Sequence, residues 1–403
     1  MLHADEDKSL AGKQNTSTHQ LDLSALYGRT PEQTDVLREK SEVAGKTGRL
    51  KSQVENGEKY SPFLFKGTEV KQEFKILDPP LRIDRIKKDF PELLQKIFAV
   101  GGDRVNASPQ ITSMNTLFLR EHNRLAGIME TANPGWDDTR VFETARIITI
   151  VVFIRIVVEE YINHIAHPAI FIVEPSIAWN APWNKPNWIA VEFSMLYRWH
   201  QLIPDDIEWG DQKIPVFKTI LNNNLLLDVG LEKAFVNMSE QPAGEIGAFN
   251  TAVALLDFEK KAIEQGRNCK LASYNDYRAN VSLKRRKRFS DISKKSDVVE
   301  FLKKTYKSVD DIDFYVGLFA EDISNNAPLP ELLQRMVAID AFSQALTNPL
   351  LSEHVWKEET FTKEGWKVIN ETKTIRDILQ RNVKGGISDD LFIGMTQQDW
   401  KRN

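Results

Sequence analysis

The sequence predicts a mainly α-helical fold with few, short strands. Apolar side chains recur at helical spacing along most of the 403 residues, whereas strand-like runs are rare. Apolar residues make up 41% of the chain and charged residues 27%, as in ordinary globular proteins. A chain of this length can bury a substantial core, and we expect one large domain.

Composition excludes several classes of function. The formal net charge of −4 gives no support for a nucleic-acid partner. Cys269 is the only cysteine, so an intrachain disulfide and a cysteine-based zinc site are both excluded. The chain contains no internal repeat and no glycine-rich phosphate loop.

The N-terminal residues 1–17 are polar and are expected to form a flexible segment, and the domain is expected to span 18–403. This beginning lacks the basic and apolar regions of a signal peptide. The most apolar stretch, 147–158, is too short to span a bilayer and is predicted to be a buried helix. We therefore expect a cytoplasmic protein. The basic run 284–288 leaves peripheral membrane contact open, although such runs are usually solvated surface.

The longest helical pattern begins after Pro109. Its apolar residues fall near one side at i, i+3 and i+4 spacing: Ile111, Met114, Leu117, Phe118, Leu125 and Ile128. Further helices are predicted over 138–164, 188–202 (stopped by Pro204), 215–238, 245–265, 297–306 and 329–346. Short strands are predicted at 74–78 and 169–173, and the Lys-, Glu- and Gly-rich segment 31–75 is predicted to be surface excursions.

The segment with the most chemical information is 197–200, which reads YRWH. A histidine at the end of an apolar helix can offer a nitrogen lone pair to haem iron. Tyr197 lies three residues before His200, close to one helical turn, so its phenol can face the same pocket. Spacing alone favours an ordinary core or surface histidine.

A set of motifs reverses that preference. Glu192-Phe193 followed by YRWH resembles the proximal-helix signature of haem-dependent fatty-acid oxygenases, and REHNRLA at 120–126 is similar to a helix of animal haem peroxidases. Residues 102–109 resemble the loop that carries the distal arginine of the peroxidases, and 267–278 resemble a later motif. The motifs follow one another in family order from about Thr18 to Pro349. The chain thus resembles the animal haem peroxidase superfamily, in its cyclooxygenase and fatty-acid dioxygenase branch, and a large helical haem-peroxidase-like domain is expected.

The resemblance implies haem b as the cofactor, with His200 as the proximal iron ligand and Arg198 as a contact to a haem propionate. Arg104 would be the distal arginine that polarises a bound peroxide. Tyr197 matches the tyrosine that becomes a radical in the oxygenases and removes a hydrogen atom from a fatty acid. Ordinary peroxidases generally carry a non-tyrosine aromatic residue at that position.

A calcium site is the second implication. Residues 18–24 resemble the peroxidase calcium loop, in which alternate residues supply hard oxygen ligands, here Thr18, Gln20, Asp22 and Ser24. Without the resemblance, this Ser/Thr/Asp spacing usually marks a helix cap or a turn.

The match fails at one place. Family members carry a distal histidine, in a Gln-x-x-x-His type segment, upstream of the calcium loop. The only candidate histidine upstream of Thr18 is His3, which lacks this motif. That segment is expected to be missing, either because the chain is part of a longer enzyme or because the chain is a degenerate relative.

The sequence therefore predicts a haem-dependent oxidoreductase that uses peroxide, O₂ and a tyrosyl radical to oxygenate an unsaturated fatty acid. Two alternatives remain open: a simple haem peroxidase that oxidises small donors with hydrogen peroxide, and a non-catalytic haem-binding relative without the distal histidine. The oligomeric state is not indicated.

Overall fold

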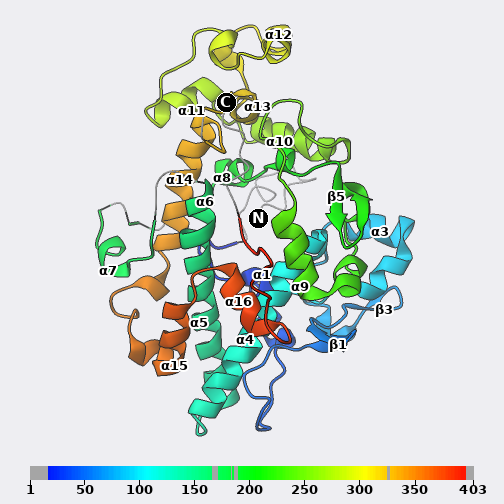
Figure 1. Ribbon diagram of the computed structural model, residues 1–403. Helices are drawn as coiled ribbons and strands as arrows, with labels where there is room; N and C mark the ends of the chain where they lie inside the picture. The colour runs from blue at the N-terminus through cyan, green and yellow to red at the C-terminus, as the bar shows by residue number, and fades with distance from the viewer. Residues whose placement is uncertain (1–16, 166–170, 183, 186–188, 325–326, 396–403) are drawn as a thin grey trace.

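The computed structural model describes residues 17–165, 171–182, 184–185, 189–324 and 327–395. The predicted flexible segment 1–17 lies outside these residues, except for Ser17. The described chain is helical, with three small two-stranded antiparallel sheets, β1–β2, β3–β4 and β5–β6 (Figure 1). The mainly α-helical fold predicted from the sequence is therefore confirmed.

The helices follow one another along the whole described chain. They are α1 (Ser24–Tyr27), α2 (Pro31–Leu37), α3 (Ile83–Asp89), α4 (Pro109–Ala132), α5 (Asp138–Ile156), α6 (Asn163–Ile165), α7 (Pro175–Ala178), α8 (Val191–Leu196), α9 (Asn224–Glu240), α10 (Leu256–Asn268), α11 (Tyr274–Asn280), α12 (Ser296–Thr305), α13 (Phe314–Ala320), α14 (Glu331–Leu346), α15 (Glu358–Glu371) and α16 (Ile375–Asn382). The strands are β1 (Gln53–Glu55), β2 (Glu58–Tyr60), β3 (Phe65–Lys66), β4 (Glu69–Val70), β5 (Asp206–Trp209) and β6 (Gln212–Pro215).

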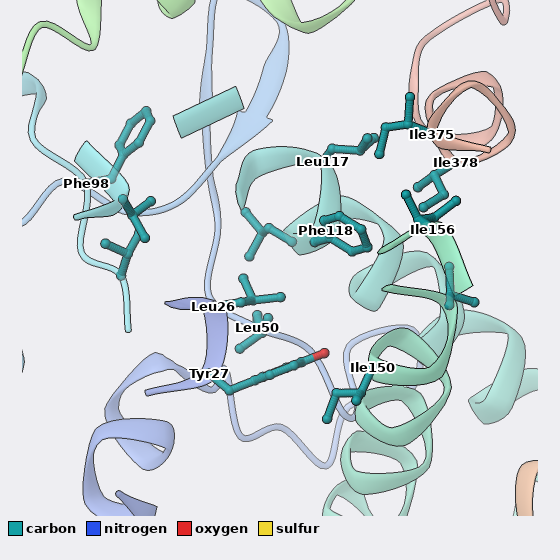
Figure 2. Close-up of a cluster of buried hydrophobic side chains, with 14 of the residues drawn as sticks. Leu26, Tyr27, Leu50, Phe98, Leu117, Phe118, Ile150, Ile156, Ile375 and Ile378 are labelled. Carbon is teal, nitrogen blue, oxygen red and sulfur yellow. The ribbon is translucent and has the colours of Figure 1, made fainter. Parts of the chain in front are cut away.

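The larger core is built on α4 and α5, in the lower half of Figure 1. The α4 helix begins at Pro109, where the Ser108 side chain accepts a hydrogen bond from the Ile111 N–H and so satisfies a donor of the first turn. Figure 2 shows Ile375 of α16 beside Leu117 of α4, and Ile378 of α16 beside Ile156 of α5, in this core. The last described helix thus closes over the central pair.

A second core occupies the upper half of Figure 1 and joins α8 to α10–α14. Met195, Tyr274 and Leu318 are fully or almost fully buried in it. Tyr161, in the π-helical turn that follows α5, packs against both cores. The segment that carries His200 follows α8 and therefore belongs to the upper core.

Two fully buried polar side chains, Tyr27 of α1 and His122 of α4, bind each other. The Tyr27 hydroxyl lies 2.9 Å from His122 Nδ1, and His122 Nε2 lies 3.0 Å from the Gly48 carbonyl oxygen. A carbonyl oxygen can only accept, so Nε2 carries the proton and Nδ1 accepts from the tyrosine. This bonding makes His122 a neutral structural group of the REHNRLA helix.

Four helix predictions are confirmed in position. The predicted pattern after Pro109 matches α4, 138–164 matches α5 and its continuation, 297–306 matches α12, and 329–346 matches α14. The apolar stretch 147–158 is a buried helix, as predicted. Within the described residues, no helix is both long enough and apolar enough to cross a membrane.

Other predictions are wrong in extent or type. The predicted helix 215–238 starts only at Asn224, and 245–265 only at Leu256, because β6 and irregular segments precede them. Ile111, predicted on the apolar face of α4, is 45% exposed, whereas Pro109, Thr112 and Ser113 beside it are the buried residues of that end of the helix.

The strand predictions also fail. Residues 74–78 form a turn that buries Phe74 instead of a strand. Of 169–173, residues 169–170 lie outside the described chain and 171–173 form no regular structure. Segment 31–75 is more than surface excursions, because it contains α2 and β1–β4 and buries Leu50 and Tyr60.

The basic run 284–288 is largely neutralised within the protein. Arg285 pairs with Asp276 and Asp310, and Arg288 pairs with Asp291 at 3.0 Å. Arg286 pairs with the buried Glu321 at 2.8 Å. These ion pairs favour the structural interpretation of the run over a membrane contact.

We predict a specific pH dependence from His122. Burial lowers the pKa of His122 from 6.5 to about 3. The unfolded chain therefore takes up the proton first as the pH falls, and stability present above pH 6.5 is lost between 6.5 and 3. Between pH 7.5 and pH 5 this loss should reach about 2 kcal/mol. Urea unfolding of wild type and His122→Gln at the two pH values measures it.

The variant should lack this part of the pH dependence, because glutamine does not titrate. His354→Gln, which changes an exposed histidine, is the control and should follow wild type. Equal pH-dependent losses in wild type and His122→Gln would contradict the assignment.

Candidate functional site

The helix that leads to the YRWH segment ends earlier than predicted. The α8 helix stops at Leu196, and Tyr197 (φ −103°, ψ 21°) and Trp199 (φ −90°, ψ 52°) have left helical geometry. The Trp199 indole N–H donates to the Leu196 carbonyl at 2.5 Å and so satisfies an acceptor at the helix end. His200 begins a separate 3₁₀ turn, His200–Leu202. The single helix predicted over 188–202 is therefore wrong, and Tyr197 and His200 are not one regular helical turn apart.

His200 is held by a carboxylate from α10. Its Nδ1 lies 2.7 Å from Glu259 Oε1, and both side chains are largely buried, with 22% and 15% exposed. The Tyr315 hydroxyl of α13 donates to the other oxygen, Glu259 Oε2, at 2.7 Å. Burial, with the adjacent Glu259 carboxylate, raises the pKa of Tyr315, so the phenol stays a donor. Three separate segments thus fix the orientation of one imidazole.

This hydrogen bond decides which nitrogen of His200 is available. A carboxylate accepts, so the Nδ1 nitrogen carries a proton in the neutral ring and Nε2 holds the lone pair. A carboxylate on the far nitrogen also makes the imidazole a stronger electron donor to a metal. The arrangement leaves Nε2 as the nitrogen of His200 that could ligate a metal ion.

Phe258 connects His200 to a second part of the site. Its ring centroid is 5.4 Å from that of His200, and the Arg82 guanidinium lies 4.0 Å over the same phenyl ring. The neighbouring Leu81 donates its N–H to the Asp103 carbonyl at 2.8 Å. Through these contacts the loop of Arg104 is linked to the neighbourhood of His200.

The Arg104 side chain binds the residue before it in the sequence, Asp103. Its guanidinium pairs with both oxygens of Asp103 at 3.1 Å, and the side chain is 36% exposed. Arg198 donates to Gln265 Oε1 of α10 at 2.6 Å and to the Ser194 carbonyl at 3.1 Å. Both arginines are thus already oriented by protein groups, and their roles toward haem stay predictions.

Tyr197 belongs to a stack of partly buried aromatic rings. Its ring lies parallel to that of Trp199, with centroids 5.4 Å apart, and Tyr161 stacks on Trp199 at 6.5 Å. Phe193 packs on Tyr197 at 4.8 Å. Burial raises the pKa of Tyr197, and the charge of Asp340 adds to the shift. The Tyr197 phenol therefore stays protonated at every physiological pH.

The predicted calcium segment forms local turns. The Gln20 N–H donates to Thr18 Oγ1 at 3.1 Å, and the Ser24 N–H donates to Asp22 Oδ1 at 2.8 Å at the start of α1. Among the described residues, no group of three or more His, Cys, Asp or Glu is placed to hold a metal ion. The calcium site, which also needs hydroxyl and carbonyl ligands, stays a prediction.

Sequence reasoning missed the partners of His200. Glu259, Tyr315 and Phe258 lie more than 50 residues from His200 in sequence, on helices whose patterns indicate only which side faces a core. The indirect signal was an aromatic residue beside an acidic one, Phe258-Glu259, at the start of a helix, which is also common on surfaces.

Comparison with known proteins identifies the family. The chain matches the family model for animal haem peroxidase over residues 3–392. It is 33% identical over 370 residues to prostaglandin G/H synthase 2 of Equus caballus, covering 91% of this chain and 58% of that protein. Identity to prostaglandin G/H synthase 1 of Rattus norvegicus is 31% over 369 residues, with the same coverage. The chain thus spans 58% of the length of these relatives.

Solved structures agree in fold. Peroxidase A from Dictyostelium discoideum superposes with a TM-score of 0.69 at 21% identity, covering 91% of this chain and 69% of that one. Fatty acid alpha-dioxygenase of Oryza sativa gives a TM-score of 0.70 at 19% identity, covering 90% and 63%. The fold, the ordered motifs and the match over nearly the whole chain lead to one conclusion: the chain belongs to the animal haem peroxidase family.

Proposed function

We propose that this chain holds haem b through His200 and acts as a haem-dependent oxidoreductase that oxygenates an unsaturated fatty acid by means of Tyr197. One observation carries the proposal: His200, whose Nδ1 is bonded to a carboxylate, directly follows Trp199 of the partly buried aromatic stack that contains Tyr197. Family membership supports the oxidoreductase part. The fatty-acid part rests on Tyr197 and on relatives that are prostaglandin G/H synthases.

The residues present fit a haem. His200 supplies the Nε2 lone pair, Glu259 and Tyr315 orient the ring, and Arg198 supplies a permanent cation for a propionate. Phe258 adds an apolar surface beside the imidazole. When bound, the haem would supply a one-electron oxidant at the expense of peroxide.

Arg104 is proposed to polarise that peroxide. The support is the contact chain from its loop through Leu81 and Arg82 to Phe258 and His200. A guanidinium is charged at every physiological pH and stabilises the negative charge that develops as an O–O bond breaks.

Tyr197 is proposed to remove the hydrogen atom. A phenol that has lost one electron and one proton can take a hydrogen atom from a carbon between two double bonds, which restores the phenol and leaves a carbon radical. O₂ then adds to that radical. The protonated Tyr197 suits this role, because it starts as a neutral hydrogen donor and is packed among aromatic rings.

Calcium binding by Thr18, Gln20, Asp22 and Ser24 is proposed as a structural feature of the same enzyme. The segment leads into α1, whose Tyr27 bonds to His122 of α4. An ion there would fix the entry of the chain into the lower core.

Haem binding should depend on His200 and be tuned by Glu259. On titration with hemin, His200→Ala should lose the Soret band that wild type develops, while the exposed-site control His354→Ala should keep it. Glu259→Gln should weaken haem affinity by about 10- to 100-fold, as for other partners of metal-bound histidines. It should also raise the Fe(III)/Fe(II) potential, because the donor imidazole becomes weaker.

The Fe(III)/Fe(II) potential and the circular dichroism of Glu259→Gln together separate a weaker imidazole ligand from a misfolded protein. A variant of Glu259 that loses affinity through misfolding would also lose its helical circular dichroism, whereas a positioning role leaves that signal intact. An unshifted, equally strong Soret band in His200→Ala would show that the ligand is another residue.

Tyr197 separates the oxygenase from the simple peroxidase. Tyr197→Phe keeps the ring stack and removes the hydroxyl, so the fold should survive. In the haem-loaded protein, oxygen uptake with linoleate should fall to background while peroxide-driven oxidation of guaiacol persists. Tyr306→Phe removes a hydroxyl that binds Asp313 on another surface, and it should change neither rate.

Three outcomes would redirect the proposal. Wild-type oxygen uptake by Tyr197→Phe would remove the radical role. Guaiacol oxidation by both proteins, without oxygenation of any fatty acid, would favour the simple peroxidase. Haem binding without either activity would favour the non-catalytic relative.

A further inference from the structure

A cavity of about 840 Å³ lies away from His200, between α4, the end of α16 and the β1–β2 hairpin. These three elements meet in the lower half of Figure 1, opposite the upper core that carries His200. The REHNRLA motif contributes directly, since Arg120, Asn123 and Arg124 line the cavity. A volume of this size is in the range of small-molecule sites.

The wall of the cavity is strongly cationic. Four arginines and three lysines line it, against three glutamates. Two further carboxylates, Glu121 and Glu130, lie behind the wall and bind wall arginines. The formal charge remains +2 when these two are counted.

The arginines are fixed in place before any ligand arrives. Arg124 and Arg381 share the fully buried Glu121 at 2.8 Å each. Arg120 binds Glu58 at 2.7 Å with only 10% of its side chain exposed. Glu121 holds Arg124 and Arg381 from behind the wall, so their remaining N–H groups stay available for an oxyanion in front, at little cost in side-chain entropy. Arg120 is instead held by Glu58 of the wall itself.

Three lysines complete the rim. Lys46, Lys59 and Lys384 are exposed, and within the described residues none of them makes an ion pair. Val54 and Val383 give the same cavity an apolar part, with the buried Leu50 and Leu119 behind it. Several converging cations favour a multiply charged anion over a single carboxylate. The apolar residues favour a ligand that carries an organic group next to its charged group.

From these features we infer that the cavity binds a phosphorylated small molecule of nucleotide size. Its phosphates lie against the arginines and lysines, and its organic group lies against the apolar residues. This inference is independent of the haem proposal, because the cavity and His200 are built from different elements.

Isothermal titration of the full chain with ADP, inorganic pyrophosphate and linoleate tests it. ADP should bind in low salt and bind more weakly as the salt rises from about 50 mM to about 300 mM, because the attraction is electrostatic. Lys59→Gln/Lys384→Gln should weaken ADP binding about tenfold, since each exposed cation contributes a factor of about three to the affinity. These two lysines are chosen because their loss leaves no buried carboxylate unpaired.

The matched control is Lys303→Gln/Lys304→Gln, which removes the same charge from α12, outside the cavity wall. It should bind ADP as wild type does. No binding of ADP, equal losses in both double variants, or stronger binding of linoleate would overturn the inference. Equal affinity for pyrophosphate and ADP would overturn the role of the apolar residues.

Discussion

A carboxylate and an imidazole cannot stay unbonded in a protein interior, and α4 buries both, at Glu121 and His122. The groups that satisfy them come from far along the chain: Tyr27 and Gly48 for His122, and Arg381 and Asn382 for Glu121. Arg124, from the same helix, donates to both oxygens of Glu121. Each ring nitrogen of His122 has one partner, and Glu121 without α16 would keep only Arg124, so the segment from Tyr27 to Gly48 and the α16 helix are both tied to α4. The lower core forms around this constraint.

The upper core holds the imidazole of His200 in one orientation. Glu259 comes from α10 and Tyr315 from α13, and the two helices pack together in the same core as Met195 and Leu196 of α8. The position of the His200 ring is therefore a property of the packing of three helices. A change in that packing would alter the hydrogen bond, and through it the donor strength of the Nε2 nitrogen.

Tyr161 joins the two halves. It follows α5 of the lower core, yet it stacks on Trp199 of the upper one, and Trp199 in turn stacks on Tyr197. The early end of α8 makes this possible, since a continuous helix would send Trp199 to another side of the axis. The irregular backbone at residues 197–199 is thus the means by which the aromatic rings meet.

The sequence by itself determined the helical class, the position of α4, α5, α12 and α14, and the family, because these depend on periodicity and on ordered local motifs. It also singled out His200 and Tyr197, since YRWH is a local signal. Tertiary structure alone decided which groups orient His200. Glu259 binds it and Tyr315 binds Glu259, and these residues are 59 and 115 positions away in sequence, where no local pattern pairs them. It likewise decided where α8 ends: local propensity favours continuing the helix through Trp199, and the packing of three aromatic rings, with an indole hydrogen bond at Leu196, outweighs that preference.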